Sequence, residues 1–173
     1  MNLQGVTKVA SYLGIKTDKF SLTDDQVLKV CVGGKEYSGL ATVLLALAST
    51  SKEPAKWSTS EQEAAVYQWL EFASLYGQTT KTNSQQTKNI LKELNKYLEN
   101  CSYLVGYAVT LADVIVYHTV YEIVNALSLS ERESYLDLCR WFDHIQQDKK
   151  VRQDNTLINF STTYISSRLA SGY

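Results

Sequence analysis

Two groups of side chains in this 173-residue sequence have types and spacings that could support catalysis or metal binding. His118 and Glu122 are four residues apart, so on a helix they would share one face as an acid–base or metal-binding pair. Cys139, Asp143 and His144 crowd one helical turn, but no fourth zinc ligand stands at a familiar spacing. A histidine on a nearly all-apolar helix is usually a core residue. We therefore interpret both groups as structural and predict no metal and no cofactor.

The glycine and lysine residues do not form a phosphate-binding motif. Gly33-Gly34-Lys35 lacks the G-x-x-x-x-G-K-[ST] spacing of a phosphate loop, and a hairpin turn explains it. The basic run from Lys149 to Arg152 could touch RNA, but at a helix end it equally fits the helix dipole or plain solvation. The formal net charge is −1, from 17 basic and 18 acidic residues, whereas nucleic-acid binders usually carry a basic excess.

Composition indicates a folded domain in a reducing compartment. Hydrophobic residues make up 45% and charged residues 20%, which argues against disorder. The three cysteines, Cys31, Cys101 and Cys139, are widely spaced, as is typical of proteins that form no disulfides. No apolar run reaches the roughly 18 residues of a membrane span, and no signal peptide is recognisable at the start. We expect a cytoplasmic protein with no membrane contact, and a nuclear location stays open.

The first third of the sequence predicts a small mixed unit. Apolar residues recur at helical spacing over 3–13, and Gly14 follows as a stop. The β-branched run 27–32 predicts a strand, the glycine pair a two-residue turn, and 35–37 the return strand of a hairpin. Ser38 can cap a helix through 41–48, which is apolar on nearly every side. Pro54 marks a linker, so we place the domain boundary near residue 56.

The remainder of the sequence predicts an all-helical bundle. Long amphipathic or apolar patterns occupy 60–78, 84–99, 110–124, 131–147 and, more briefly, 156–169. Thr110 and Asp113 form a T-x-x-D capping box at the start of one of them. The expected fold class is mostly α, a helical bundle over 57–173 preceded by a unit with a two-stranded hairpin over 1–56.

Five motifs in order carry a family resemblance. They are YQWLEF (67–72), ELNKYLE (93–99), YLVGYAVTLAD (103–113), YL (135–136) and RWFDHIQ (140–146). The capping box and the ordered set resemble the glutathione-transferase-like auxiliary subunits of the multi-aminoacyl-tRNA synthetase complex, the eukaryotic translation elongation factor 1 epsilon family. The resemblance implies a glutathione-transferase C-terminal-like helical domain over 57–173. It also implies that 1–56 is a truncated thioredoxin-like unit.

Catalysis is not expected from this sequence. A glutathione transferase carries a Tyr, Ser or Cys on a first strand, where 3–13 here predicts a helix, and a cis-proline before a later strand. No proline precedes or interrupts 27–32, and a cis bond at another residue costs about 2.5–4 kcal/mol. The resemblance therefore implies a non-catalytic scaffold in support of translation. A divergent glutathione transferase and a subunit associated with elongation factor 1 remain alternatives.

The resemblance implies two docking faces, and the first joins the helix after the hairpin to the first long helix of the bundle. Val43, Leu47, Tyr67 and Glu71 are the candidates for this face. Their helix at 41–48 has more apolar side chains than one stripe would use, and such an excess often marks a packing partner. By resemblance the partner is the N-terminal domain of methionyl-tRNA synthetase. The alternative is that these side chains belong to the internal core.

The second implied face contains Arg140, with Asp143 nearby. By resemblance, the arginine before Trp-Phe contacts the transferase-like domain of glutamyl-prolyl-tRNA synthetase. Arginine suits interfaces because its planar guanidinium can stack and donate several hydrogen bonds at once. The alternative for Arg140 is a helical salt bridge to Glu133 or Asp137. Direct contact with tRNA is not expected.

Overall fold

A computed structural model describes residues 3–15, 20–22, 27–32, 34–51, 57–79 and 84–161 of the chain. Its N-terminal elements are α1 (Leu3–Tyr12), β1 (Phe20–Leu22), β2 (Leu28–Val32), β3 (Lys35–Ser38) and α2 (Leu40–Thr50). Its C-terminal elements are α3 (Ser60–Thr79), α4 (Ser84–Leu98), α5 (Leu111–Ala126), α6 (Leu129–Glu133), α7 (Leu136–Gln146) and α8 (Lys149–Arg152). The mostly α fold class is confirmed. The expected domain boundary near residue 56, with Pro54, lies outside the described residues.

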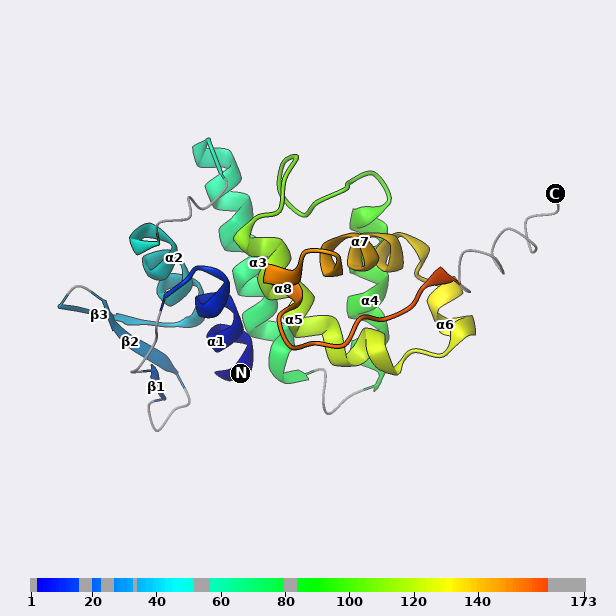
Figure 1. The fold of residues 1–173 in the computed structure, drawn as a ribbon, viewed down its shortest axis with the longest axis horizontal. Coiled ribbons are helices and arrows are strands. Elements are labelled where there is room, and N and C mark those ends of the chain that lie inside the picture. Colours follow the sequence, from blue (N-terminus) through cyan, green and yellow to red (C-terminus); the bar gives the residue numbers. More distant parts are fainter. Residues whose placement is uncertain are drawn as a thin grey trace.

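The small sheet lies at one end of the molecule, and the helical bundle occupies the rest (Figure 1). Its strands run in the order β1-β2-β3, all antiparallel, with Val30 paired to Phe20 on one side and Tyr37 on the other. The expected hairpin is β2–β3. The third strand, β1, was missed because three residues carry too little alternation to predict a strand, and pairing with β2 creates it.

The start of α2 differs from expectation. Ser38 does not cap it, because Ser38 is the last residue of β3. Gly39 stands between strand and helix with φ 88° and ψ 148°, and its N–H donates to the Leu28 carbonyl at 2.9 Å. A positive φ of this kind suits glycine, since a Cβ would clash with the backbone. A glycine hinge, rather than a serine cap, therefore turns the chain from sheet to helix.

Two helical expectations at the C-terminal end were wrong in part. The stretch 131–147 is not one helix, since α6 and α7 are separated at Ser134 and Tyr135, where Tyr135 has φ −133° and ψ 50°. Of the expected helical stretch over 156–169, residues 156–160 are not helical, and 162–169 lie outside the described residues. Instead, Gln146 exchanges two hydrogen bonds with Ile158, at 2.7 and 2.9 Å, and so holds that segment along α7.

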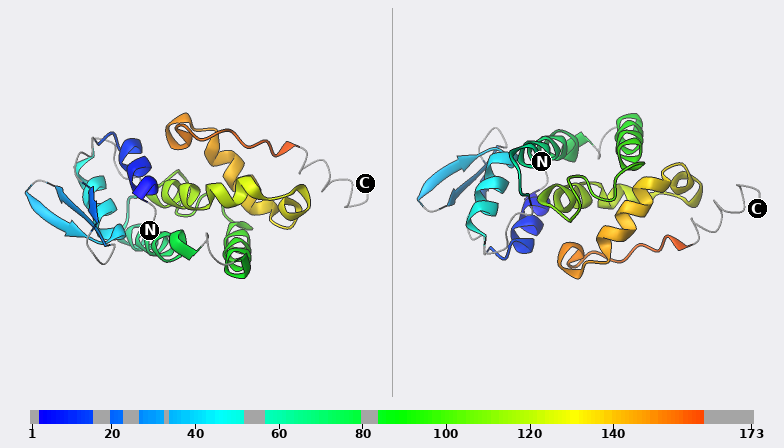
Figure 2. Two further views of the ribbon diagram at one scale, coloured as in Figure 1. Left: turned by 90° about the horizontal axis from the view of Figure 1, so that it is seen from below. Right: turned by 90° about the horizontal axis from the view of Figure 1, so that it is seen from above.

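The core is built around α5, which lies against α1, α3 and α7. Ten of its side chains are buried, among them Asp113 and Tyr117. Both further views show α5 in the middle of the molecule, with the sheet at one side and α6 at the other (Figure 2). Because α1 and α2 contact α5 and α3, the N-terminal unit shares this core with the bundle. Among the helices that the structure describes, none is long and apolar enough to cross a membrane.

Candidate docking faces

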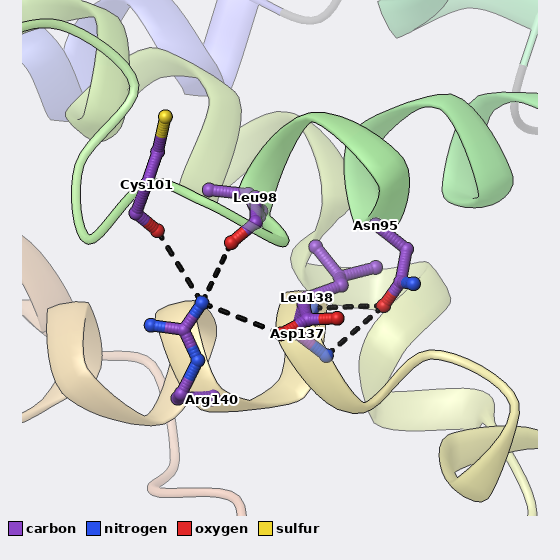
Figure 3. A network of polar contacts seen from close by, with 6 residues as sticks. All are labelled: Asn95, Leu98, Cys101, Asp137, Leu138 and Arg140. Atoms are coloured by element: carbon purple, nitrogen blue, oxygen red, sulfur yellow. Dashed lines mark hydrogen bonds and ion pairs between the residues drawn. The ribbon is translucent and has the colours of Figure 1, made fainter.

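Arg140 lies at the junction of α7 with the end of α4. One guanidinium nitrogen, Nη2, donates to the carbonyl oxygens of Leu98 at 2.6 Å and Cys101 at 3.3 Å (Figure 3). The same nitrogen lies 3.4 Å from Asp137 Oδ1, one turn earlier on α7. The last carbonyls of a helix lack intrahelical partners, and a cation there also suits the helix dipole. Arg140 therefore acts as a C-terminal cap for α4.

Asn95 provides the reciprocal contact. Its Oδ1 accepts hydrogen bonds from the backbone N–H groups of Asp137 at 3.0 Å and Leu138 at 3.1 Å (Figure 3). The residue before α7, Tyr135, makes no side-chain cap of its own. An amide on α4 thus takes the place of the N-cap of α7. Sequence reasoning missed Asn95, because a cap supplied by another helix leaves no local motif.

The Arg140 side chain is 45% exposed, so its structural contacts leave part of the guanidinium open to solvent. The salt bridge to Asp137, which the sequence analysis kept as the alternative, is present, and it coexists with this exposure. Asp143 lies one turn further and is half-buried, accepting from the side-chain amides of Gln146 at 2.8 Å and Gln147 at 3.2 Å. Arg140 and Asp143 therefore share one face of α7 and are both held in place.

On the first predicted face, two of the four candidates are wrong. Val43 and Leu47 are fully buried, because they lie on the side of α2 that packs against the sheet, α1 and α3. Their side chains are part of this chain's own core and offer a partner no surface. Tyr67 on α3 is 44% exposed, and Glu71 one turn later is also exposed. Of the four candidates, the two on α3 are therefore the ones that a partner can reach.

The capping box at Thr110 and Asp113 is confirmed, and Asp113 does more than cap. Its Oδ2 accepts from the Thr110 backbone N–H at 2.9 Å and from the Thr110 hydroxyl at 3.0 Å. Its Oδ1 accepts from the Leu104 N–H at 2.9 Å and from Trp141 Nε1 at 3.0 Å. Burial raises the pKa of the Asp113 carboxyl, and the four hydrogen bonds oppose that rise. One carboxylate thus ties the start of α5 to the preceding loop and to α7.

The groups that could have supported chemistry do not form a reactive cluster: Cys139 is buried and His118 partly buried, whereas Glu122 and His144 are exposed. Burial lowers the pKa of His118 to about 4, and Asn155 lies 3.4 Å from its Nδ1. Burial raises the pKa of the Cys139 thiol to about 12, and its Sγ lies 3.7 Å from the Arg132 carbonyl. Within the described ranges, no three His, Cys, Asp or Glu side chains gather as a metal site would require.

The basic run at the end of the bundle also makes contacts within the chain. Arg152 Nη1 donates to the Gln146 carbonyl at 2.8 Å, at the end of α7. Lys150 Nζ lies 5.3 Å from the centre of the Tyr12 ring, in the geometry of a cation–π contact. Lys150 therefore contributes to the contact between α1 and α8, and Arg152 to the contact between α8 and α7.

Comparison with known proteins decides the family. The family model described as nuclear-export cofactor Arc1p matches residues 62–149. Eukaryotic translation elongation factor 1 epsilon-1 of Cricetulus griseus is 36% identical over 163 residues, covering 91% of this chain and 90% of that protein. This chain belongs to the elongation factor 1 epsilon family. The human protein of the same name is 35% identical over 161 residues, covering 89% of this chain and 87% of its own length.

A more distant relative points the same way. The tRNA-aminoacylation cofactor arc1 of Schizosaccharomyces pombe is 26% identical over 117 residues, covering 66% of this chain and 24% of that protein. The ordered motifs of the elongation factor 1 epsilon family had indicated this assignment, which is confirmed. The chain thus belongs with the glutathione-transferase-like auxiliary subunits of the aminoacyl-tRNA synthetase complex.

Proposed function

We propose that this chain is a non-catalytic scaffold of the multi-aminoacyl-tRNA synthetase complex. It bridges the transferase-like domains of methionyl-tRNA synthetase and glutamyl-prolyl-tRNA synthetase, and so raises the local concentration of enzymes that support translation. We place it in the cytoplasm, with access to the nucleus. Membership of the elongation factor 1 epsilon family supports the auxiliary role, and the two faces described above support the bridging.

The bridging proposal rests on Arg140, which is both held by hydrogen bonds and partly exposed to solvent. Its guanidinium is fixed against the end of α4 by carbonyls at 2.6 and 3.3 Å while its side chain stays 45% exposed. An arginine held in this way loses less conformational entropy when a partner binds than a freely rotating one. Glutamyl-prolyl-tRNA synthetase is the proposed partner of this face, with Asp143 as a neighbouring contact.

The second partner, methionyl-tRNA synthetase, is assigned to α3. With Val43 and Leu47 in the core, Tyr67 and Glu71 are the candidates that remain on this face. A half-exposed tyrosine beside a carboxylate offers both an apolar ring and hydrogen-bonding groups, which is typical of interface anchors.

Binding of the full chain to each purified synthetase domain tests the bridge. Arg140→Ala should weaken binding of the glutamyl-prolyl enzyme's domain at least tenfold and leave the methionyl enzyme's domain unaffected. The double variant Tyr67→Ala/Glu71→Lys should do the reverse. Asn95→Ala is the matched control, because it disturbs the same helix junction without removing the guanidinium. Equal loss of both partners in either variant would contradict a bridge with two separate faces.

A role within elongation factor 1 is the second candidate, since the hamster and human relatives described above are named after that factor. It predicts co-purification with elongation factor 1 subunits rather than with synthetases. Affinity capture of the chain from cell extract, with identification of its partners, separates the two functions.

The non-catalytic part of the proposal has its own test. The pKa shifts of His118 and Cys139 leave both groups uncharged at neutral pH, so neither is a ready cation or thiolate. We expect no retention on glutathione resin and no conjugation of an electrophile to glutathione. Either activity, if it disappears on denaturation, would favour the divergent glutathione transferase instead.

A further inference from the structure

A surface groove runs between α3 and α4, on the side of α3 away from α2. Its volume is about 620 Å³, and aromatic and aliphatic side chains of both helices line it, including Trp69, Phe72, Leu75, Tyr76 and Tyr97. Both helices lie along the lower edge of the left-hand view of Figure 2. A groove of this size falls within the range of ordinary binding clefts and exceeds what one side chain needs.

The floor of the groove is preformed. The Trp69 ring centre lies 5.2 Å from that of Phe72 and 4.8 Å from that of Tyr97, both edge to face, and Phe72 lies 4.6 Å from Tyr76. The Tyr97 hydroxyl donates to the Leu104 carbonyl at 2.9 Å, which fixes the ring while its polar end is satisfied. A partner would therefore not have to order these rings on binding.

The groove leaves apolar surface in water. Leu75 is 67% exposed and Tyr97 is 44% exposed. Together with Tyr67 on the neighbouring side of α3, they place three large exposed apolar side chains on these two helices. Single exposed apolar residues are ordinary, but a cluster over a concave surface is typical of an interaction site.

The charge of the groove selects its occupant. Of the described residues that line it, two are charged, Glu71 on α3 and Glu93 on α4, and both are acidic. Both side chains are exposed at the rim rather than buried in the floor. An acidic segment or an anionic surface would be repelled there, whereas a lysine or arginine would be attracted.

We propose that this groove binds a segment of a partner protein that carries large aromatic or branched aliphatic side chains flanked by lysine or arginine. The apolar side chains enter between the helices, and the basic ones pair with Glu71 and Glu93. This site goes beyond the bridging function proposed above, since its floor lies between α3 and α4; it adjoins the proposed methionyl-tRNA synthetase face, with which it shares Glu71, and Arg140 takes no part in it.

Selection from a phage-displayed library of random dodecapeptides, followed by titration of the enriched peptides, tests the site. Selection on the full chain should enrich sequences that combine Trp, Phe or Leu with Lys or Arg. Leu75→Glu should weaken their binding at least tenfold. Leu129→Glu is the matched control, because Leu129 on α6 is an exposed leucine outside the groove, 45% accessible. The charge reversal Glu71→Lys/Glu93→Lys should change the preference to acidic peptides.

Four results would overturn the proposal, and three of them concern peptide binding. They are enrichment of sequences without basic residues, binding that is insensitive to Leu75→Glu, and a loss that is equal in the Leu129→Glu control. A fourth is a chain that sediments as a dimer and becomes monomeric in Leu75→Glu, because a second copy would then be the occupant. The assay contains no synthetase, so its outcome is independent of whether the chain bridges the two enzymes.

Discussion

Replacement of Arg140 by alanine should destabilise the free chain as well as weaken partner binding. The change removes hydrogen bonds from Nη2 to the carbonyls of Leu98 and Cys101, at 2.6 and 3.3 Å, and an ion pair to Asp137 at 3.4 Å. A hydrogen bond to a charged group contributes about 1.5–3 kcal/mol when well buried. With the side chain 45% exposed, solvent screening reduces this, and an exposed ion pair adds less than about 1 kcal/mol. We expect a net loss of about 1–2 kcal/mol.

Thermal unfolding measures this loss. For a chain of this length, about 1 kcal/mol corresponds to about 2–4 °C in Tm, so Arg140→Ala should lower the Tm by roughly 2–8 °C. Arg140→Lys keeps the charge near the α4 carbonyls but lacks the planar guanidinium, so its Tm should fall between those of Arg140→Ala and the wild type. A Tm for Arg140→Ala within about 1 °C of the wild type would refute the capping argument. So would a lysine variant no more stable than the alanine one.

The same calculation shows why binding data on Arg140 need a stability-matched control. Asn95→Ala removes two hydrogen bonds from the start of α7, at 3.0 and 3.1 Å, and loss of an N-cap costs about 0.5–2 kcal/mol. The two variants should therefore be similarly destabilised, but only one lacks the guanidinium. If binding of the glutamyl-prolyl enzyme's domain falls equally in both, the loss reflects the helix junction rather than a direct contact.

The remaining predictions concern the core and the turns. Asp113→Asn turns an amide N–H toward the Thr110 donors and should lower the free energy of unfolding in urea by about 2–4 kcal/mol. A loss below about 1 kcal/mol would mean that these hydrogen bonds are weak. The pKa of His118 is lowered to about 4 by burial, so the unfolded chain takes up a proton first as pH falls. Stability should thus drop by up to about 3 kcal/mol between about pH 6.5 and 4, and His118→Gln should remove most of that slope in pH-dependent urea titrations. Gly39→Ala, at φ 88°, should cost about 1–3 kcal/mol by the same method. Gly77→Ala within α3, where the added Cβ meets a Thr119 methyl at 3.8 Å, should instead stabilise by about 0.5–1 kcal/mol, and equal effects of the two glycine changes would count against the φ argument.

Local sequence signals were sufficient for most of the fold. The β2–β3 hairpin, α1 and the Thr110–Asp113 capping box were predictable because their determinants lie within a few residues of one another. The sequence does not reveal that Asp113 also binds Leu104 and Trp141, since the Trp141 contact spans 28 positions and depends on how α7 packs. Prediction thus succeeded where the physics is local and stopped at contacts between elements.

The two wrong docking residues show the same limit. An apolar excess on α2 predicts that something covers it, but not whether the cover is a partner or the chain itself. Here α2 is contacted by β2, β3, α1 and α3. Val43 and Leu47 are buried in that internal packing. To predict which sides of α2 are covered by the chain itself, one would need the positions of these four other elements. Conversely, the exposure of Leu75 was not predictable from the sequence, because a leucine within the apolar pattern of α3 is expected to lie in the core.

Polar groups that could act chemically are used to join helices in this structure. Asp113 accepts four hydrogen bonds, Arg140 caps α4, and the buried Cys139 holds its proton to about pH 12. The contacts that Asp113, Arg140 and Cys139 make with other helices or loops hold those elements together and so contribute rigidity. A rigid body with aromatic and charged residues on α3, α4 and α7 is what an adaptor needs, because it pays little ordering entropy on binding. The proposed docking role therefore rests on the exposed residues of α3, α4 and α7.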